Sequence, residues 1–428
     1  MRTTRTTQPT DQHEGSTGPS RRHFLVGAAA AAGTTVVLSQ SGLVGAAAPA
    51  TGRSLIVIFL RGGADGLTLL APLGDPAYAT RRGPLRVQSS TARALTGPAA
   101  NSYFALHPRA QRLAELYAAG RVAVVPAAGL PVINRSHFDA QLMMEAGSFG
   151  LAHGSGWAGR WLAATGATDD HVLRSIGFGG TTPASLRGYP SMVAYSLADL
   201  SLLSWGPNRT QVRTNQTERL AAGGTHPLFS TWSEPTLDTI DSLATLGDTS
   251  LPTGWPNTQL GKRLWPVARL IEAGFPVEFS HAELDGWDTH SAQGTPDEAS
   301  GNMASLVAPL DGAIGAFVDR IGSRIADTTV VVMSEFGRRA EVNSSGGTDH
   351  GTAFPMMVIG GGVRPGVVGP WPGLADNQLV DGDLRLMVDY RTVLSEVLSR
   401  RLGATSSHLS SVFPGFSTSP ATWVNVCQ

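Results

Sequence analysis

The chain has 428 residues, of which 42% are hydrophobic and 15% are charged, and its formal net charge at pH 7 is −1. These values are ordinary for a globular protein and predict no surface for nucleic acid or anionic membranes. Lys262 is the only lysine, which leaves a Schiff-base mechanism a single candidate. Cys427 is the only cysteine, which excludes an internal disulfide and a structural zinc site built on paired thiolates.

Residues 1–50 are predicted to be a targeting segment rather than part of the fold. The stretch SRRHFL at 20–25 carries the paired arginines of a twin-arginine signal, and an Ala- and Gly-rich apolar run, 24–38, follows it. That run is too short and too weakly hydrophobic to be a stable transmembrane span. A basic tail before a chance apolar run is the alternative. The signal predicts export of the folded protein by the twin-arginine machinery to the periplasm or the extracellular space.

Residues 51–428 alternate strand-like apolar runs with helical patterns. In chain order, the sequence predicts a strand at 55–60, a helix at 107–119, a strand at 121–126, a helix at 137–146, a strand at 173–178, a helix at 263–273, a strand at 275–280, a helix at 304–325, strands at 329–333 and 355–359, and a helix at 390–401. The polar segment at about 204–258 is expected to be a long surface excursion. This alternation indicates one α/β domain, a three-layer α/β/α sandwich with a mostly parallel central sheet.

Five potential metal ligands lie just after, or just before, predicted strands: Asp65, Asp288, His290, Glu335 and His350. Ligands of open α/β sheets gather outside the carboxyl ends of the strands. Asp288 and His290 are two residues apart, so in an extended segment both side chains point the same way and can reach one ion. A carboxylate with an imidazole suits zinc, manganese or iron better than magnesium. The pattern therefore predicts a metal-dependent enzyme.

Each of these residues also has a simpler structural explanation. Asp288 can cap a turn, with His290 as a surface residue. Glu335 can form an ion pair with Arg338 or Arg339, which contributes little if exposed. Asp65 and Asp349 lie in glycine-rich loops, where an Asx-type hydrogen bond is common.

Ser136 is the candidate nucleophile, because a hydroxyl at a helix N-terminus lies where backbone N–H groups favour an oxyanion. Arg135 beside it, or Arg61, can bind the remaining oxygens of a phosphate or sulfate. His137 is either a helper acid that contacts the substrate or simply the first residue of the helix. A plain N-cap serine is the alternative for Ser136. The sequence contains no G-x-S-x-G elbow, which argues against an ordinary α/β-hydrolase esterase.

The order of several motifs in this chain resembles the bacterial exported family known as domain of unknown function 1501. After the twin arginines, the motifs that carry the resemblance are LRGGADGL (60–67), NRSHFDAQ (134–141), GWDTH (286–290), SEFGRR (334–339), GGTDHGT (346–352), GGGVRPGVVG (360–369) and VFPG (412–415). The family is grouped with the alkaline phosphatase and sulfatase superfamily. The resemblance therefore implies an alkaline phosphatase-like sandwich and, in active members, one or two divalent ions (zinc, manganese or calcium) beside a nucleophile.

By position, Asp65 resembles the superfamily's first-strand metal aspartate, and Ser136 falls where a helix-capping nucleophile lies. Asp288 and His290 resemble the pair that holds one ion. Glu335 stands where an Asp-His pair is usual, and His350 stands where the last histidine ligand lies. The Asp288–His290 spacing is shorter than usual and no ligand follows Glu335, so one ion fits as well as two.

The leading hypothesis is an exported metal-dependent hydrolase of phosphate or sulfate esters, in which Ser136 attacks at a metal-bound centre. Its substrate would be a small-molecule or glycan ester. The alternative is a non-catalytic exported protein that keeps the fold and binds an anionic glycan or a partner protein. A third reading is transfer or isomerisation of a phosphorylated sugar.

Overall fold

The computed structural model describes residues 34–37, 52–149, 154–166, 172–200, 214, 242–244, 246–297 and 301–428. The paired arginines of the predicted signal lie outside these residues, as does most of the predicted excursion at about 204–258. Across the described ranges, the helices are all too short or too polar to cross a membrane.

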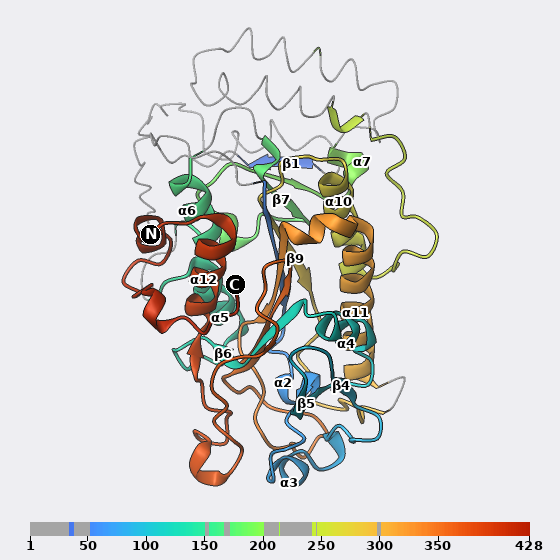
Figure 1. Ribbon diagram of the computed structural model, residues 1–428, viewed down its shortest axis with the longest axis vertical. Helices are drawn as coiled ribbons and strands as arrows, with labels where there is room; N and C mark the ends of the chain where they lie inside the picture. Colours follow the sequence, from blue (N-terminus) through green and yellow to red (C-terminus); the bar gives the residue numbers. More distant parts are fainter. Residues whose placement is uncertain are drawn as a thin grey trace, which may run out of the picture.

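A ten-stranded mixed sheet forms the centre of the described chain, with helices on both of its faces (Figure 1). Its strands are β1 (Thr34–Val37), β2 (Ser54–Leu60), β6 (Val122–Gly129), β7 (Ser175–Phe178), β8 (Ser191–Ala194), β9 (Phe279–Leu284), β10 (Thr328–Ser334), β11 (Phe354–Gly360), β12 (Gly366–Val367) and β13 (Val388–Asp389). The order is β1-β8-β7-β9-β2-β10-β11-β6-β12, with β13 also paired to β6. Strands β8, β7, β9, β2 and β10 run parallel, whereas β1 and β11 run antiparallel to their neighbours. The predicted α/β class with a mostly parallel central sheet is confirmed.

The helices lie in two layers, because side chains of the central strand alternate between the two faces of the sheet. In Figure 1, α4 (Gln111–Ala118), α10 (Gln259–Glu272) and α11 (Asn302–Ile321) lie on one side, and α5 (His137–Ala146), α6 (Trp157–Ala164) and α12 (Tyr390–Leu402) lie on the other. Ile56, Ile58 and Leu60 of β2 join a buried core with the first group of helices. Leu55, Val57 and Phe59 join a second core with the other group. Both faces of β2 are therefore apolar, which is why the strand reads as one continuous hydrophobic run.

A second, three-stranded sheet lies beyond the carboxyl end of β2 and was not predicted. It consists of β3 (Leu70–Ala71), β4 (Arg93–Leu95) and β5 (Asn101–Leu106), in the order β3-β5-β4. The short helices α2 (Gly66–Leu69) and α3 (Tyr78–Arg82) accompany it, at the bottom of Figure 1. Among the described residues, the other α-helices are α7 (Leu197–Leu200) and α13 (Ser406–Val412).

The predicted elements agree best with the observed ones where a local signal marks the boundary. The helix predicted at 137–146 is observed over the same residues as α5, and the Ser136 side chain accepts a hydrogen bond from the Asp139 backbone N–H. The strand predicted at 275–280 is wrong by several residues, because β9 begins at Phe279 and continues through Leu284. Its polar residues, His281 and Glu283, conceal the strand from a hydrophobic pattern.

His107, which follows β5, links stability to pH. Burial, more than the nearby charges, lowers the pKa of its imidazole from 6.5 to about 4, and its Nδ1 accepts a hydrogen bond from the Arg109 backbone N–H at 3.0 Å. The folded state therefore binds the proton less readily than the unfolded state. The contribution of neutral His107 to the free energy of unfolding is fully present above pH 6.5. It is lost as the pH falls through about 4.

We expect the free energy of unfolding to fall by about 3 kcal/mol more between pH 7 and pH 4 in the wild type than in His107→Asn. The asparagine Oδ1 can accept the same hydrogen bond from the Arg109 backbone N–H, and asparagine does not titrate. Urea unfolding at both pH values measures the difference, and equal losses in the two proteins would contradict the assignment.

Candidate metal centre

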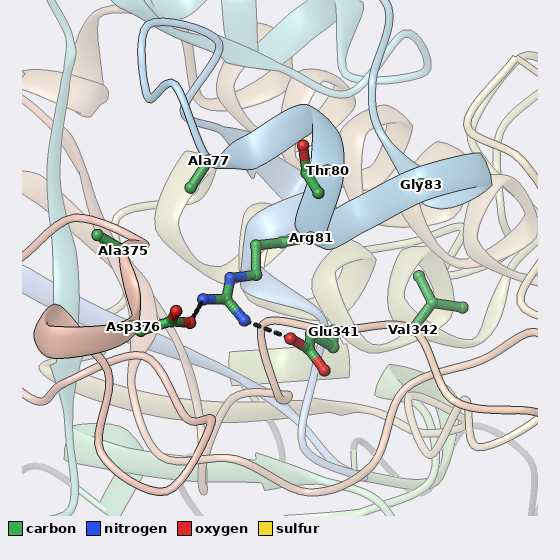
Figure 2. Close-up of a pocket in the computed structure, with 8 residues that line it drawn as sticks. All are labelled: Ala77, Thr80, Arg81, Gly83, Glu341, Val342, Ala375 and Asp376. Atoms are coloured by element: carbon green, nitrogen blue, oxygen red, sulfur yellow. Dashed lines mark hydrogen bonds and ion pairs between the residues drawn. The ribbon is translucent and has the colours of Figure 1, made fainter.

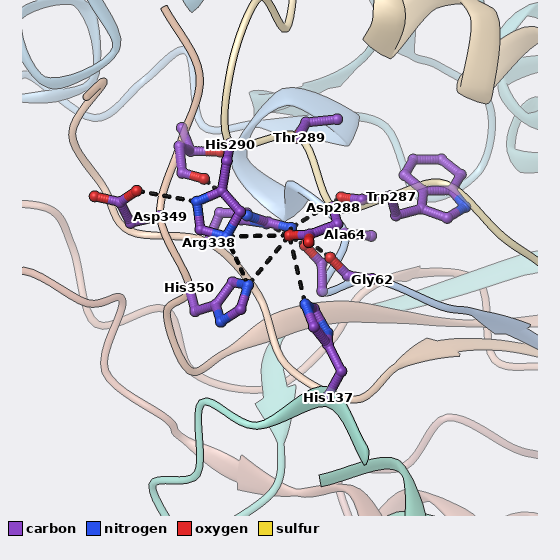
Figure 3. A network of polar contacts seen from close by, with 12 residues as sticks. Gly62, Ala64, His137, Trp287, Asp288, Thr289, His290, Arg338, Asp349 and His350 are labelled. Atoms are coloured by element: carbon purple, nitrogen blue, oxygen red, sulfur yellow. Dashed lines mark hydrogen bonds and ion pairs between the residues drawn. The ribbon is translucent and has the colours of Figure 1, made fainter. Parts of the chain in front are cut away.

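Four side chains from three separate segments meet beyond the carboxyl ends of the central strands (Figure 3). His137 is the first residue of α5, Asp288 and His290 follow β9, and His350 lies between β10 and β11. The Asp288 Oδ1 atom lies 3.1 Å from His350 Nε2, 3.2 Å from His290 Nε2 and 3.4 Å from His137 Nε2. The Nε2 atoms of His290 and His350 are 2.8 Å apart. The three Nε2 atoms therefore share Asp288 Oδ1 as their common point, and His137, Asp288 and His350 each have a ligand atom within 4.8 Å of the others.

The other ring nitrogen of each histidine faces a hydrogen-bond acceptor. His137 Nδ1 lies 2.8 Å from Glu335 Oε1, and His290 Nδ1 lies 3.1 Å from Asp349 Oδ1. His350 Nδ1 lies 2.8 Å from the backbone carbonyl oxygen of Arg135. Because carboxylates and carbonyls accept protons in hydrogen bonds, each Nδ1 of a neutral imidazole must carry its hydrogen. Each Nε2 then presents a lone pair to the shared point.

These residues fit a transition-metal ion. Two ligands bound at about 2.1 Å lie roughly 3.0–3.4 Å from each other for bond angles between 90° and 110°, which is close to the observed spacings. Three imidazoles and a carboxylate suit zinc, and acceptors behind the imidazoles are the usual outer shell of a metal site. His137 Nε2 is buried and has no hydrogen-bond partner, as expected for a nitrogen that binds a metal ion. Asp288 and His290 are 47% and 44% exposed, so a substrate can reach the centre.

Arg338 joins the loops that carry these ligands. Its side chain is fully buried, and its Nη2 donates to Asp288 Oδ1 at 2.6 Å. It also donates to four backbone carbonyls on three loops, those of Gly62, Gly63, Trp287 and Thr348. Burial raises the pKa of the Asp288 carboxyl, but its contacts with the Arg338 guanidinium and with His350 outweigh burial and lower the pKa to about 2. Asp288 is therefore an anion at neutral pH.

Gly62 lets the loop after β2 approach Asp288 closely. Its φ is +120°, and a Cβ atom on it would lie 2.5 Å from the Asp288 backbone nitrogen. A side chain at this position would push the two loops apart. Gly62 of the motif LRGGADGL is thus explained by close contact between two backbones.

Glu335 lies behind His137 instead of beside Asp288. Its carboxylate is fully buried and accepts hydrogen bonds from the Gly62 N–H at 2.9 Å and from the Gln141 amide at 2.8 Å, in addition to His137. Burial raises the pKa of the Glu335 carboxyl, but the hydrogen bonds from His137 and Gln141 lower it by more. The pKa therefore lies below its usual value. The predicted alternative of an ion pair with Arg338 is wrong, because Arg338 pairs with Asp288.

The remaining predicted site residues have other partners. Asp65 is buried, and its Oδ2 accepts from Arg82, Thr68 and Gln293. Arg135 forms an ion pair with Asp383 at 2.8 Å but is 45% exposed. Arg61 lies between two glutamates, Glu145 and Glu283. Ser136 is exposed and caps α5.

The positions of two residues near the candidate centre were not predicted. His137 was predicted to contact the substrate, and Gln141 was not among the predicted site residues. The two are four residues apart in NRSHFDAQ and so lie on one face of α5, a signal that the predicted helix already contained.

An open cavity of about 680 Å³ lies away from these ligands, at α3 (Figure 2). Arg81 projects into it and forms ion pairs with Glu341 and Asp376. Both carboxylates are strongly exposed, so these pairs contribute little to stability.

Residues 244–408 match the family described as Protein of unknown function (DUF1501). The matched segment includes GWDTH, SEFGRR and GGTDHGT, and thus three of the four residues of the candidate centre. The resemblance expected from the sequence is therefore confirmed. No curated protein is similar enough to match the chain.

Several solved structures match this chain at low sequence identity. The lipoteichoic acid synthase LtaP from Listeria monocytogenes is 11% identical, with 75% of this chain and 68% of that chain covered and a TM-score of 0.30. The PsFucS1 sulfatase from Pseudoalteromonas sp. is 12% identical, with 88% and 73% covered and a TM-score of 0.36. The alkaline phosphatase from the Antarctic bacterium TAB5 is 11% identical, with 73% and 93% covered and a TM-score of 0.31.

Proposed function

We propose that this chain is an exported hydrolase of phosphate or sulfate esters that depends on one divalent metal ion. His137, Asp288, His290 and His350 would hold the ion. The observation that carries the proposal is the convergence of three Nε2 atoms on one carboxylate oxygen, with each Nδ1 already bonded to an acceptor. Outer-shell acceptors of this kind orient imidazole ligands toward a metal ion.

The bound ion would supply Lewis-acid stabilisation of the charge on the transferring group. Ser136 would form a bond from its Oγ to phosphorus or sulfur as the ester bond breaks. Its proton passes to solvent, and the departing alcohol takes one up. Water then releases phosphate or sulfate and restores the hydroxyl. Arg135, on the same loop and partly exposed, would bind a remaining oxygen of the group if it leaves Asp383.

Export by the twin-arginine route to the periplasm or beyond remains part of the proposal. The paired arginines at 21–22 and the apolar run after them support it. A glycan or small-molecule ester would then be met outside the cytoplasm.

The second candidate is an exported binding protein without catalysis. The arginines that were predicted to bind the substrate anion already have acidic partners, which favours this candidate. Arg61 contacts two glutamates, and Arg135 pairs with Asp383. In that case the centre would hold an ion without ester hydrolysis.

Elemental analysis of the purified protein, followed by assays with aryl phosphates and aryl sulfates, tests the proposal. We expect about one ion per chain in the wild type and none in His350→Ala, with hydrolysis lost in the variant. A wild type that takes up no zinc, manganese or calcium would refute the metal centre. One bound ion with no hydrolysis of any ester would favour the binding protein.

Ser136→Asn separates the nucleophile from the helix cap. Asparagine caps a helix as well as serine does, so the free energy of unfolding and the bound ion should be retained. If Ser136 is the nucleophile, kcat should fall by a factor of about 1,000 or more. Ser136→Ala serves as the control for the cap, with an expected cost of about 1 kcal/mol. Unchanged kcat in Ser136→Asn would exclude the serine from the chemistry.

A further inference from the structure

A chain of hydrogen bonds runs from Arg61 to the candidate metal ligand His137. Arg61 Nη1 donates to Gln141 Oε1 at 2.9 Å, and Gln141 Nε2 donates to Glu335 Oε1 at 2.8 Å. The same Glu335 oxygen lies 2.8 Å from His137 Nδ1. The chain links the loop after β2 with α5 and with the end of β10.

The direction of every bond in this chain is determined by Arg61. A guanidinium has only donors, so Gln141 must turn its carbonyl oxygen toward Arg61. The amide NH₂ group then faces Glu335, which must accept. Glu335 also accepts from the Gly62 N–H at 2.9 Å. With all of its neighbours donating, this carboxylate can only accept from His137, so Nδ1 of that ring carries the hydrogen.

Arg61 is itself held by a second cluster of acidic and imidazole groups. Its Nη2 lies 2.6 Å from Glu145 Oε1 and also contacts Glu283, and its guanidinium lies over the Phe59 ring. Glu145, Glu283 and His281 have one ligand atom each within 4.8 Å of the others, a spacing that suits a cation. The Arg61 guanidinium bonds both of these carboxylates and supplies the positive charge there.

We propose that Arg61 and Gln141 are positioning residues that set the His137 tautomer and so present His137 Nε2 to the metal ion. The proposal rests on the proposed metal centre. It gives Arg61 a role that differs from the predicted contact with the substrate, because its donors are used by Glu145, Glu283 and Gln141. It also accounts for the buried Nε2 atom of His137 that has no partner.

Gln141→Met tests the proposal, because methionine keeps the length of the side chain and removes both hydrogen bonds. We expect the Kd for Zn²⁺, measured by competition with a chelating dye, to rise by about 10- to 100-fold. The metal-free protein should lose some thermal stability as well, because the buried Glu335 carboxylate loses one of its donors. The matched control is Gln111→Met, which removes an exposed hydrogen bond to Glu115 on α4 and should leave the Kd unchanged.

A second measurement needs no metal and no activity. In the metal-free, ¹⁵N-histidine-labelled protein, the His137 signal is identified by its absence in His137→Gln. We expect the wild type to show the tautomer with hydrogen on Nδ1 and Gln141→Met to show a mixture. An unchanged tautomer together with an unchanged Kd would overturn the proposal. If the wild type shows the expected tautomer but binds no metal, the positioning chain stands and the proposed function fails.

Discussion

Replacement of Arg338 by methionine is expected to lower the free energy of unfolding by about 3–5 kcal/mol. The change removes the donor of the Gly62, Gly63 and Thr348 carbonyls and the arginine partner of Asp288, whereas the Trp287 carbonyl still accepts from the Thr289 N–H. Buried acceptors that lose their partners cost about 1–3 kcal/mol each before the structure relaxes. Urea unfolding, followed by circular dichroism, measures the loss.

The same variant also tests what Arg338 contributes to the ion site. Electrostatics alone would make the site bind a cation more tightly once a positive charge is removed. We expect weaker Zn²⁺ binding instead, because the three ligand-bearing loops lose their common anchor. Arg339→Met is the control: Arg339 is 42% exposed, so its loss should cost less than about 1 kcal/mol. Equal stability of the two variants would show that Arg338 does not hold the loops together.

Removal of the ion by a chelator is expected to lower the melting temperature of the wild type by roughly 5–10 °C. A ligand present at a thousandfold excess over its Kd, and bound only by the folded state, stabilises that state by about 4 kcal/mol. Each kcal/mol moves the midpoint of a large domain by about 2 °C. Scanning calorimetry with and without EDTA, after loading with Zn²⁺, measures this difference.

His350→Ala should melt at the same temperature with and without EDTA, because it lacks one of the four ligands. His408→Gln changes a histidine on α13 and should respond to the chelator as the wild type does. If EDTA shifts His350→Ala as much as the wild type, the stabilising ion binds elsewhere.

Much of the fold could be predicted because its signals are local. The β2 strand is buried on both faces and is therefore apolar throughout, and α5 begins at a serine whose side chain caps it. The carboxyl end of β9 was misjudged because His281 and Glu283 lie in the strand, where they belong to the cluster around Arg61. The small sheet was missed because β3 and β4 have two and three residues, too few to show a period.

The sequence by itself determined that Asp288, His290 and His350 are candidate ligands, because residue type and position after a strand are properties of a short segment. Only the tertiary structure decided which side chains share one point. In the folded chain, His137 of α5 lies beside Asp288, and Glu335 contacts the other side of that histidine. The Asp65 carboxylate forms an ion pair with Arg82. These choices depend on contacts between residues about 150 to 200 positions apart or on the pairing of buried charges. No local pattern encodes such contacts, because they follow from how the sheet orders its strands and from where each buried charge finds a partner.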